Sequence, residues 1–258
     1  MWRKLLVQTL LLTAFSFPTA SFANAKFDTN STTPNFLVIY FHSYGGDYLE
    51  AFEKPSKSDS IAKAFMKDIP GVAVMTVDRD PAASLNGSDG YRVVTQLILQ
   101  SYDKYPSLKH IILSGTSLGA YESVVYPFYA PANILEKIHG IISVEPTDDV
   151  AELYWKTGSP RVRELLNVAF HGSPKQEPDY YRTHSVKTIW SHMPDRPQTK
   201  VCIVSAKRDK VVPPMQQKRL ATTLREKKMN VRLVEIDRTH SVADAVTYGD
   251  ALHFVTGR

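Results

Sequence analysis

The chain has 258 residues, of which 43% are hydrophobic and 22% are charged. This balance is typical of a globular protein and excludes a disordered one. The formal net charge of +5 falls by two, to +3, without Arg3 and Lys4, which lie in a segment that we expect to be removed. The remaining basic residues alternate with acids and form no continuous stripe, so we expect no nucleic-acid partner.

The first residues have the pattern of a secretory signal peptide. A basic pair precedes an apolar run over residues 5–17, and small residues follow up to Ala25. The run is shorter than the roughly 20 apolar residues that span a bilayer. We therefore expect a signal peptide over 1–25 and a mature domain over 26–258 with no stable membrane span. The single cysteine, Cys202, allows no intrachain disulfide, and we expect export to a bacterial periplasm or the medium.

Short apolar segments alternate with amphipathic segments along the mature chain. We predict strands at 36–42, 72–77, 110–114, 138–144, 200–205 and 231–236. We predict helices at 59–67, 91–105, 118–128, 215–228 and 241–255. The strands lack polar alternation, as expected for parallel strands that are covered on both faces. The order predicts an α/β fold with a doubly wound, mostly parallel sheet of about six strands.

One stretch, residues 149–198, departs from this rhythm because it has no strand and is rich in aromatic residues, histidine and proline. It follows a sheet strand and so starts at the carboxyl edge, where ligands bind in such folds. We expect a helical cap insertion there, with a few of its aromatic side chains facing a substrate and the others packing on the sheet.

The segment Gly115-Thr116-Ser117-Leu118-Gly119 separates a predicted strand from a predicted helix. G-x-S-x-G in this setting is typical of a nucleophile elbow, a tight turn that exposes a serine hydroxyl at the sheet edge. The two glycines allow close backbone contact around a strained serine. The helix start directs free N–H groups and partial positive charge at that serine. Ser117 is thus the candidate nucleophile.

A serine hydroxyl needs a base to remove its proton, and the base needs an orienting acid. Asp209 follows one later strand and His240 follows the next, which is the order Ser, acid, His associated with this elbow. Loops after parallel strands share one edge of the sheet, so these three side chains can converge. Acids after the strand 138–144 are alternatives to Asp209, namely Glu145, Asp148 and Asp149.

The developing oxyanion also needs hydrogen-bond donors. The backbone N–H of Leu118, directly after the nucleophile, is one candidate. The loop after the strand 36–42 offers the others, Ser43, Tyr44 and Gly45.

Together, the His42–Gly46 loop, the Ser117 elbow, Asp209 before Val-Val-Pro-Pro, and His240 resemble the α/β-hydrolase superfamily. The Tyr44-Gly45-Gly46 turn and the acid loop resemble the prolyl-oligopeptidase-like serine hydrolases and their esterase relatives. This resemblance implies that a tyrosine hydroxyl serves the oxyanion. Ser43 departs from the usual His-Gly, and the chain has no β-propeller. The early first strand predicts that the two leading strands common in the superfamily are absent.

These features favour an exported serine hydrolase that cleaves carboxylic esters through an acyl-enzyme on Ser117. A small aminopeptidase or acyl-peptidase is the alternative within enzymes, with Glu145 or Glu152 as candidate anchors for a peptide amino group. A non-catalytic ligand-binding protein of the same fold is the alternative outside them. The histidines lack metal-ligand spacing, so we expect no metal and no cofactor. The expected partner is a small-molecule ester or acyl substrate, and the oligomeric state stays open.

Overall fold

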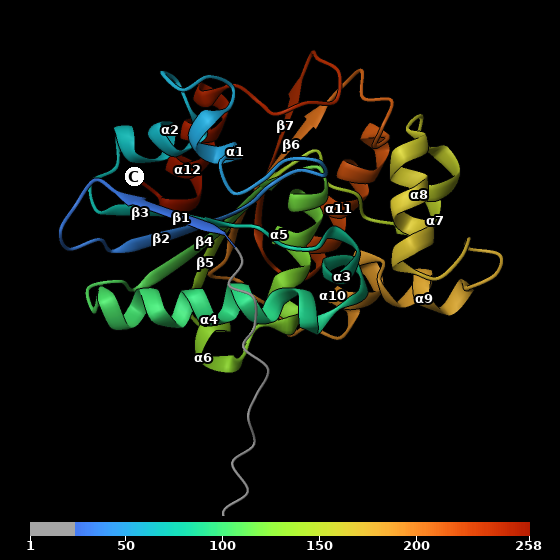
Figure 1. The fold of residues 1–258 in the computed structure, drawn as a ribbon, viewed down its shortest axis with the longest axis horizontal. Helices are drawn as coiled ribbons and strands as arrows, with labels where there is room; N and C mark the ends of the chain where they lie inside the picture. Colours follow the sequence, from blue (N-terminus) through green and yellow to red (C-terminus); the bar gives the residue numbers. More distant parts are fainter. Residues whose placement is uncertain (1–23) are drawn as a thin grey trace, which may run out of the picture.

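The computed structural model describes residues 24–258. The predicted signal peptide lies outside the described residues except for its last two positions, and Ala25 already pairs with Val77 in the sheet. The described part forms one seven-stranded sheet with the order β1-β3-β2-β4-β5-β6-β7 (Figure 1). The strands are β1 (Ala25–Thr29), β2 (Phe36–Phe41), β3 (Val72–Val77), β4 (His110–Thr116), β5 (Ile138–Val144), β6 (Lys200–Ala206) and β7 (Asn230–Ile236).

The six predicted strands are β2 to β7, and all neighbouring pairs among them are parallel. Strands β2 and β3 are buried at every position, which explains why their sequences show no polar alternation. The predicted absence of leading strands is wrong in part. Strand β1 precedes the first predicted strand and runs antiparallel to β3 at the sheet edge. Its exposed Ala25 and Lys26 hide the apolar pattern of a strand.

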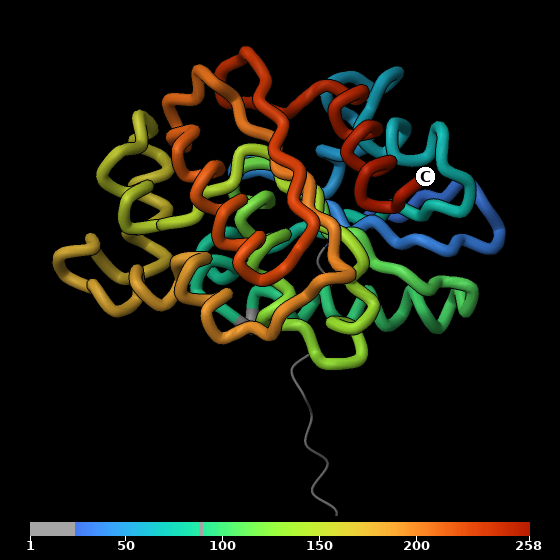
Figure 2. Tube along the Cα trace, turned by 180° about the vertical axis from the view of Figure 1, so that it is seen from behind, coloured from blue at the N-terminus to red at the C-terminus, as the bar shows by residue number. Residues whose placement is uncertain are grey.

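Helices cover both faces of the sheet, as the doubly wound prediction requires. One face carries α4 (Ser88–Lys104), α5 (Leu118–Tyr129) and α11 (Pro214–Glu226), whose apolar residues share one core. The other face carries α1 (Glu50–Glu53), α2 (Ile61–Lys67) and α12 (Ala245–Thr256), which build a second core. Figures 1 and 2 show α2 beside α12, so segments far apart in sequence cover the same face. Two short helices, α3 (Pro81–Asn86) and α6 (Ala132–Leu135), lie in the connections.

Four helices occupy the stretch between β5 and β6, where the sequence predicts an insertion without strands. They are α7 (Val150–Lys156), α8 (Pro160–Ala169), α9 (Pro178–Thr183) and α10 (Val186–Ser191). Helices α7, α8 and α9 lie together at one end of the molecule, and α10 packs against α5 and α11 (Figure 1). Helix α8 also contacts α3, so this segment covers the region next to the carboxyl end of β4. Over residues 24–258, we find no helix with the length and apolar content that crossing a membrane requires.

Candidate active site

The predicted elbow lies between β4 and α5. Ser117 is the single residue between these elements, and its backbone has φ 55° and ψ −114°. A residue with a side chain adopts this region at a cost of about 1–3 kcal/mol, and such strain concentrates at functional sites. The N–H of Ser117 donates to the carbonyl of Val144 at 2.9 Å, which fixes the turn to the neighbouring strand β5. The turn therefore holds Ser117 at the carboxyl edge of the sheet.

The two glycines of the motif are required by close backbone contacts. A Cβ at Gly115 would overlap the carbonyl of Gly119, and a Cβ at Gly119 would overlap the carbonyl of Phe41. The end of β2 thus packs directly against the first turn of α5. This contact brings the loop that starts at His42 next to the Ser117 elbow.

The structure brings Ser117, His240 and Asp209 into one hydrogen-bonded chain. His240 Nε2 lies 2.9 Å from Ser117 Oγ, and His240 Nδ1 lies 2.7 Å from Asp209 Oδ2. With its proton on Nδ1, His240 donates to Asp209 and accepts from the Ser117 hydroxyl. The other oxygen of Asp209 accepts the backbone N–H groups of Val211 and Val212 at 2.7 and 2.9 Å. These bonds orient a buried acid toward the histidine and the histidine toward the serine.

Two of the alternative acids, and a serine and a histidine of neighbouring elements, lie in other contacts. Ser114 is fully buried within β4, and His253 lies in α12, where its Nδ1 contacts a backbone carbonyl. Asp148 binds the guanidinium of Arg219 through both oxygens at 2.9 Å. Asp149 accepts two backbone N–H groups at the start of α7. None of these four residues contacts Ser117 or His240 within the described part of the chain.

Glu145, the remaining alternative acid, does reach the histidine. Its Oε2 lies 2.9 Å from His240 Nδ1. Burial alone would lower the pKa of His240, but the hydrogen bonds and charges of Asp209 and Glu145 outweigh it and raise this pKa to about 9. Burial raises the pKa of Glu145, and the contact with His240 offsets part of that rise.

The loop after β2 differs from the prediction at Ser43. Both the N–H and the hydroxyl of Ser43 donate to the carboxylate of Glu50, a buried residue of α1. These donors are therefore not free to bind an oxyanion. A Cβ at Gly46 would overlap Glu50 Oε2, so the glycine makes room for the carboxylate. Glu50 also accepts from the hydroxyl of Tyr40 at 2.8 Å, and it thereby ties the loop to the sheet.

The next residues of this loop leave their backbone donors free. Among residues 24–258, neither Tyr44 nor Gly45 donates its N–H to another group. Gly45 has φ 84°, a conformation that favours glycine. The side chain of Tyr44 is 40% exposed and lines the same cavity as Ser117 and Leu118. The Leu118 N–H is the first of α5, where no helical carbonyl can reach it.

A second buried group holds the start of the loop. The guanidinium of Arg79 donates to the carbonyl of His42 at 2.7 Å and forms an ion pair with Glu122 of α5. Both side chains of this pair are almost completely buried. Glu50, Arg79 and Glu122 could not be predicted from the sequence, because nothing in their spacing marks them as neighbours of the elbow.

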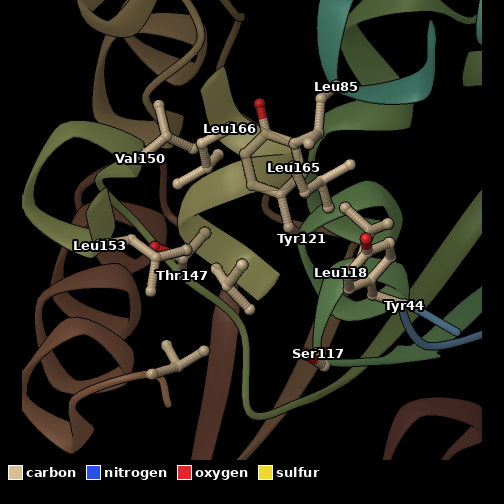
Figure 3. Close-up of a pocket in the computed structure, with 12 residues that line it drawn as sticks. Tyr44, Leu85, Ser117, Leu118, Tyr121, Thr147, Val150, Leu153, Leu165 and Leu166 are labelled. Atoms are coloured by element: carbon tan, nitrogen blue, oxygen red, sulfur yellow. The ribbon is translucent and has the colours of Figure 1, made fainter. Parts of the chain in front are cut away.

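An apolar pocket opens at Ser117 (Figure 3). Its walls come mainly from α3, α5, α7, α8 and the loop before α11. Besides Ser117 and Tyr44, the lining residues are Leu85, Leu118, Tyr121, Thr147, Val150, Leu153, Val162, Leu165, Leu166 and Val212. None of them carries a charge. The cavity volume is about 30 Å³, space for about two water molecules. Tyr44 and Leu165 line both this pocket and a second cavity of about 230 Å³ between α3 and α8.

Glu145, Asp209 and His240 also form the one group of metal-type donors that we find among the described residues, with their ligand atoms within 4.8 Å of one another. Their sequence positions, after three different strands, give no ligand spacing. The donor atom that His240 offers this group is Nδ1, which already contacts both carboxylates. The hydrogen bonds within the site thus account for the grouping.

No protein-family model and no curated protein sequence matches the chain. The structure is similar to that of an acylaminoacyl peptidase from Pyrococcus horikoshii, with a TM-score of 0.67 and 10% identity over 91% of this chain and 38% of that one. A puromycin-hydrolysing peptidase from Mycobacterium tuberculosis gives a TM-score of 0.64 and 15% identity over 91% of this chain and 37% of that one.

One of two fungal esterases from Rhizomucor miehei gives a TM-score of 0.64 and 14% identity, over 87% of this chain and 75% of the esterase. The chain therefore spans less than two fifths of the length of the two peptidases and three quarters of the esterase. These likenesses, together with the sheet order and the elbow, define the class: the chain has the α/β-hydrolase fold.

Proposed function

We propose that the protein is a serine hydrolase that cleaves carboxylic esters with short, apolar acyl groups. The observation that carries this proposal is the Ser117–His240–Asp209 chain of hydrogen bonds at the mouth of an uncharged pocket. A nucleophile, a base and an orienting acid within hydrogen-bond reach are what acyl transfer requires.

The reaction proceeds in two halves. In the first, Ser117 Oγ attacks the ester carbonyl while its proton passes to His240 Nε2. The imidazolium then gives this proton to the leaving alcohol as the carbon–oxygen bond breaks, and an acyl-enzyme remains on Ser117. In the second half, His240 takes a proton from water, which attacks the acyl carbonyl, and the proton returns to Ser117 Oγ as the carboxylic acid leaves.

Both halves pass through a tetrahedral oxyanion. We assign its donors to the backbone N–H groups of Leu118 and Tyr44. Two observations support this assignment over the tyrosine hydroxyl that the resemblance implies. The Tyr44 side chain is half-exposed, and its hydroxyl makes no hydrogen bond within residues 24–258. A free hydroxyl is not preorganised, whereas the loop backbone is fixed by Glu50 and Arg79.

The size and polarity of the pocket support an ester over a peptide. A volume of about 30 Å³, space for about two water molecules, favours a small acyl group. An aminopeptidase also needs a free anionic side chain for the substrate amino group. Of the two acids considered for that role, Glu145 contacts His240, and Glu152 binds Arg219 and Lys156.

The test is hydrolysis of p-nitrophenyl acetate, butyrate and octanoate beside a panel of aminoacyl p-nitroanilides, with Ser117→Ala as the control. We expect turnover of acetate that depends on Ser117 and no turnover of the anilides. Cleavage of the anilides alone would assign a peptidase. Saturable binding of the esters without turnover, equal in wild type and Ser117→Ala, would assign a non-catalytic binding protein.

We also propose that the protein acts outside the cytoplasm, on the basis of the basic and apolar pattern before Ala25. Expression of the full chain in a Gram-negative host tests this by fractionation and by N-terminal sequencing of the product. The expected product begins at Lys26 in the periplasm or medium. An uncleaved cytoplasmic product would contradict the proposal.

A further inference from the structure

His240 Nδ1 faces two carboxylates. Asp209 Oδ2 lies 2.7 Å from this nitrogen and Glu145 Oε2 lies 2.9 Å from it. A triad needs only one acid here. The mechanism above leaves the second carboxylate without a role, although both acids are completely buried at the side chain.

The backbone holds Glu145 in this position. The residue directly follows β5 and has φ 60°, a strained value for a residue with a side chain. Its N–H donates to the carbonyl of Val204 at 2.8 Å. Its Oε2 accepts the N–H of Ser241, the residue after the histidine, at 3.0 Å. Glu145 is thus fixed to the strand β6 on one side and to the histidine loop on the other.

Burying a carboxylate is costly unless its charge is compensated. Oε1 of Glu145 has no hydrogen-bond partner among the described residues, so the contacts of Oε2 are what compensate the group. Of these, only His240 can carry a positive charge. The presence of a strained, buried carboxylate at this point therefore indicates an interaction with the protonated histidine.

We infer that Glu145 is a second positioning acid, which shares the Nδ1–H of His240 with Asp209 and can take over from it. The inference rests on the proposed function of Ser117 and His240. The titratable groups that act on Glu145 from the surrounding elements are His240, Asp209 and the buried phenol of Tyr248 in α12. The one cationic side chain of the His240 loop, Arg238, is bound to Ser241 and the carbonyl of Val242.

The consequence for the reaction is specific. The proton of Ser117 passes to His240 Nε2 while the Nδ1 proton stays in place, so the imidazolium forms with both carboxylates at Nδ1. Either acid alone then keeps the correct tautomer and stabilises the positive charge. An enzyme whose catalytic histidine has a single acid partner loses about 10⁴-fold in kcat when that acid becomes an amide, because the histidine then adopts the wrong tautomer.

A double-mutant cycle on ester hydrolysis tests this inference. We expect Asp209→Asn alone to lower kcat by less than about 10²-fold, and Asp209→Asn with Glu145→Gln to lower it by about 10⁴-fold. A loss of about 10⁴-fold in Asp209→Asn alone would overturn the inference. The single Asp209→Asn variant gives this answer even if substitution of Glu145 prevents folding.

The pH profile separates a positioning role from a structural one. His240 must be neutral to accept a proton, so kcat/KM of the wild type rises with pH up to about 9. Glu145→Gln removes a negative charge that favours the imidazolium. We therefore expect the acidic limb of the pH profile of kcat/KM to shift by about 1–3 units toward lower pH. Glu145→Asp, which keeps the charge, should restore part of the shift. An unchanged limb in Glu145→Gln would contradict the inference.

Asp237→Asn is the matched control. Asp237 lies three residues before His240, is largely exposed and pairs with Arg208 at 2.9 Å. Its substitution should leave the limb where it is, whereas an equal shift would indicate a general charge effect. If the wild type hydrolyses no ester and binds no serine-directed probe, the proposed function itself is wrong. If the wild type is active but the double-mutant cycle does not give the expected rates, only the inference about Glu145 is wrong.

Discussion

The small size of the pocket predicts how kcat/KM depends on the length of the acyl chain. Leu165 of α8 lines both the pocket at Ser117, about 30 Å³, and the second cavity of about 230 Å³. Leu165→Ala removes this wall and joins the two spaces. The wild type should prefer p-nitrophenyl acetate because the small pocket favours a short acyl chain. The variant should prefer butyrate, because each buried methylene contributes about 0.8 kcal/mol and two contribute about 15-fold in kcat/KM.

The assay is kcat/KM for the acetate, butyrate and octanoate esters in wild type, Leu165→Ala and Val168→Ala. Val168 lies on the same helix and lines only the second cavity, so its variant should keep the wild-type preference. Removing a buried leucine side chain costs about 2–5 kcal/mol of stability, so the thermal transition of each variant should be measured beside the rates. The reasoning is refuted if Leu165→Ala folds and keeps the wild-type chain-length profile, or if the wild type already prefers octanoate.

Three further predictions concern the site. Glu50→Gln should lower kcat at least tenfold with little change in KM, because the loop that positions the Tyr44 N–H loses its anchor. The control Glu53→Gln, at a half-buried residue of the same helix, should leave kcat unchanged. An unchanged kcat in Glu50→Gln would show that the loop plays no part. Tyr44→Phe should keep kcat within about twofold, whereas a tenfold loss would assign the hydroxyl as the donor. The interactions that raise the pKa of His240 contribute in full to the free energy of unfolding below pH 6.5. This contribution is lost as the pH rises through about 9. In urea unfolding, the stability difference between wild type and His240→Gln should therefore shrink by up to about 3 kcal/mol from pH 6 to pH 10, and a difference that grows over this range would contradict the assigned charge.

The arrangement of the main site residues could be predicted from the sequence because it follows from topology. Ser117, Asp209 and His240 each follow a parallel strand, and the carboxyl ends of parallel strands share one edge. The strands themselves are recognisable because apolar β-branched residues fill them. Strand β1 cannot be recognised in this way, because it lies at the edge of the sheet and only part of its surface is buried.

Other parts of the site depend on contacts that no local pattern encodes. Ser43 follows a strand in the position expected of an oxyanion donor, but both its N–H and its hydroxyl donate to Glu50. These hydrogen bonds depend on a turn that brings α1 back to the loop. The sequence offers Glu145 only as an alternative to Asp209, and only the three-dimensional structure shows both acids at the same nitrogen.

The central claim is that Ser117 is an activated nucleophile. Labelling with a fluorophosphonate probe, followed by intact mass and peptide mapping, tests it most directly. We expect one adduct per chain, located on Ser117, with a rate that rises with pH toward about 9 as His240 becomes neutral. Labelling should be absent in Ser117→Ala and slowed in His240→Gln. A folded wild type that stays unlabelled, or a Ser117→Ala variant that labels as fast as the wild type, would contradict the claim.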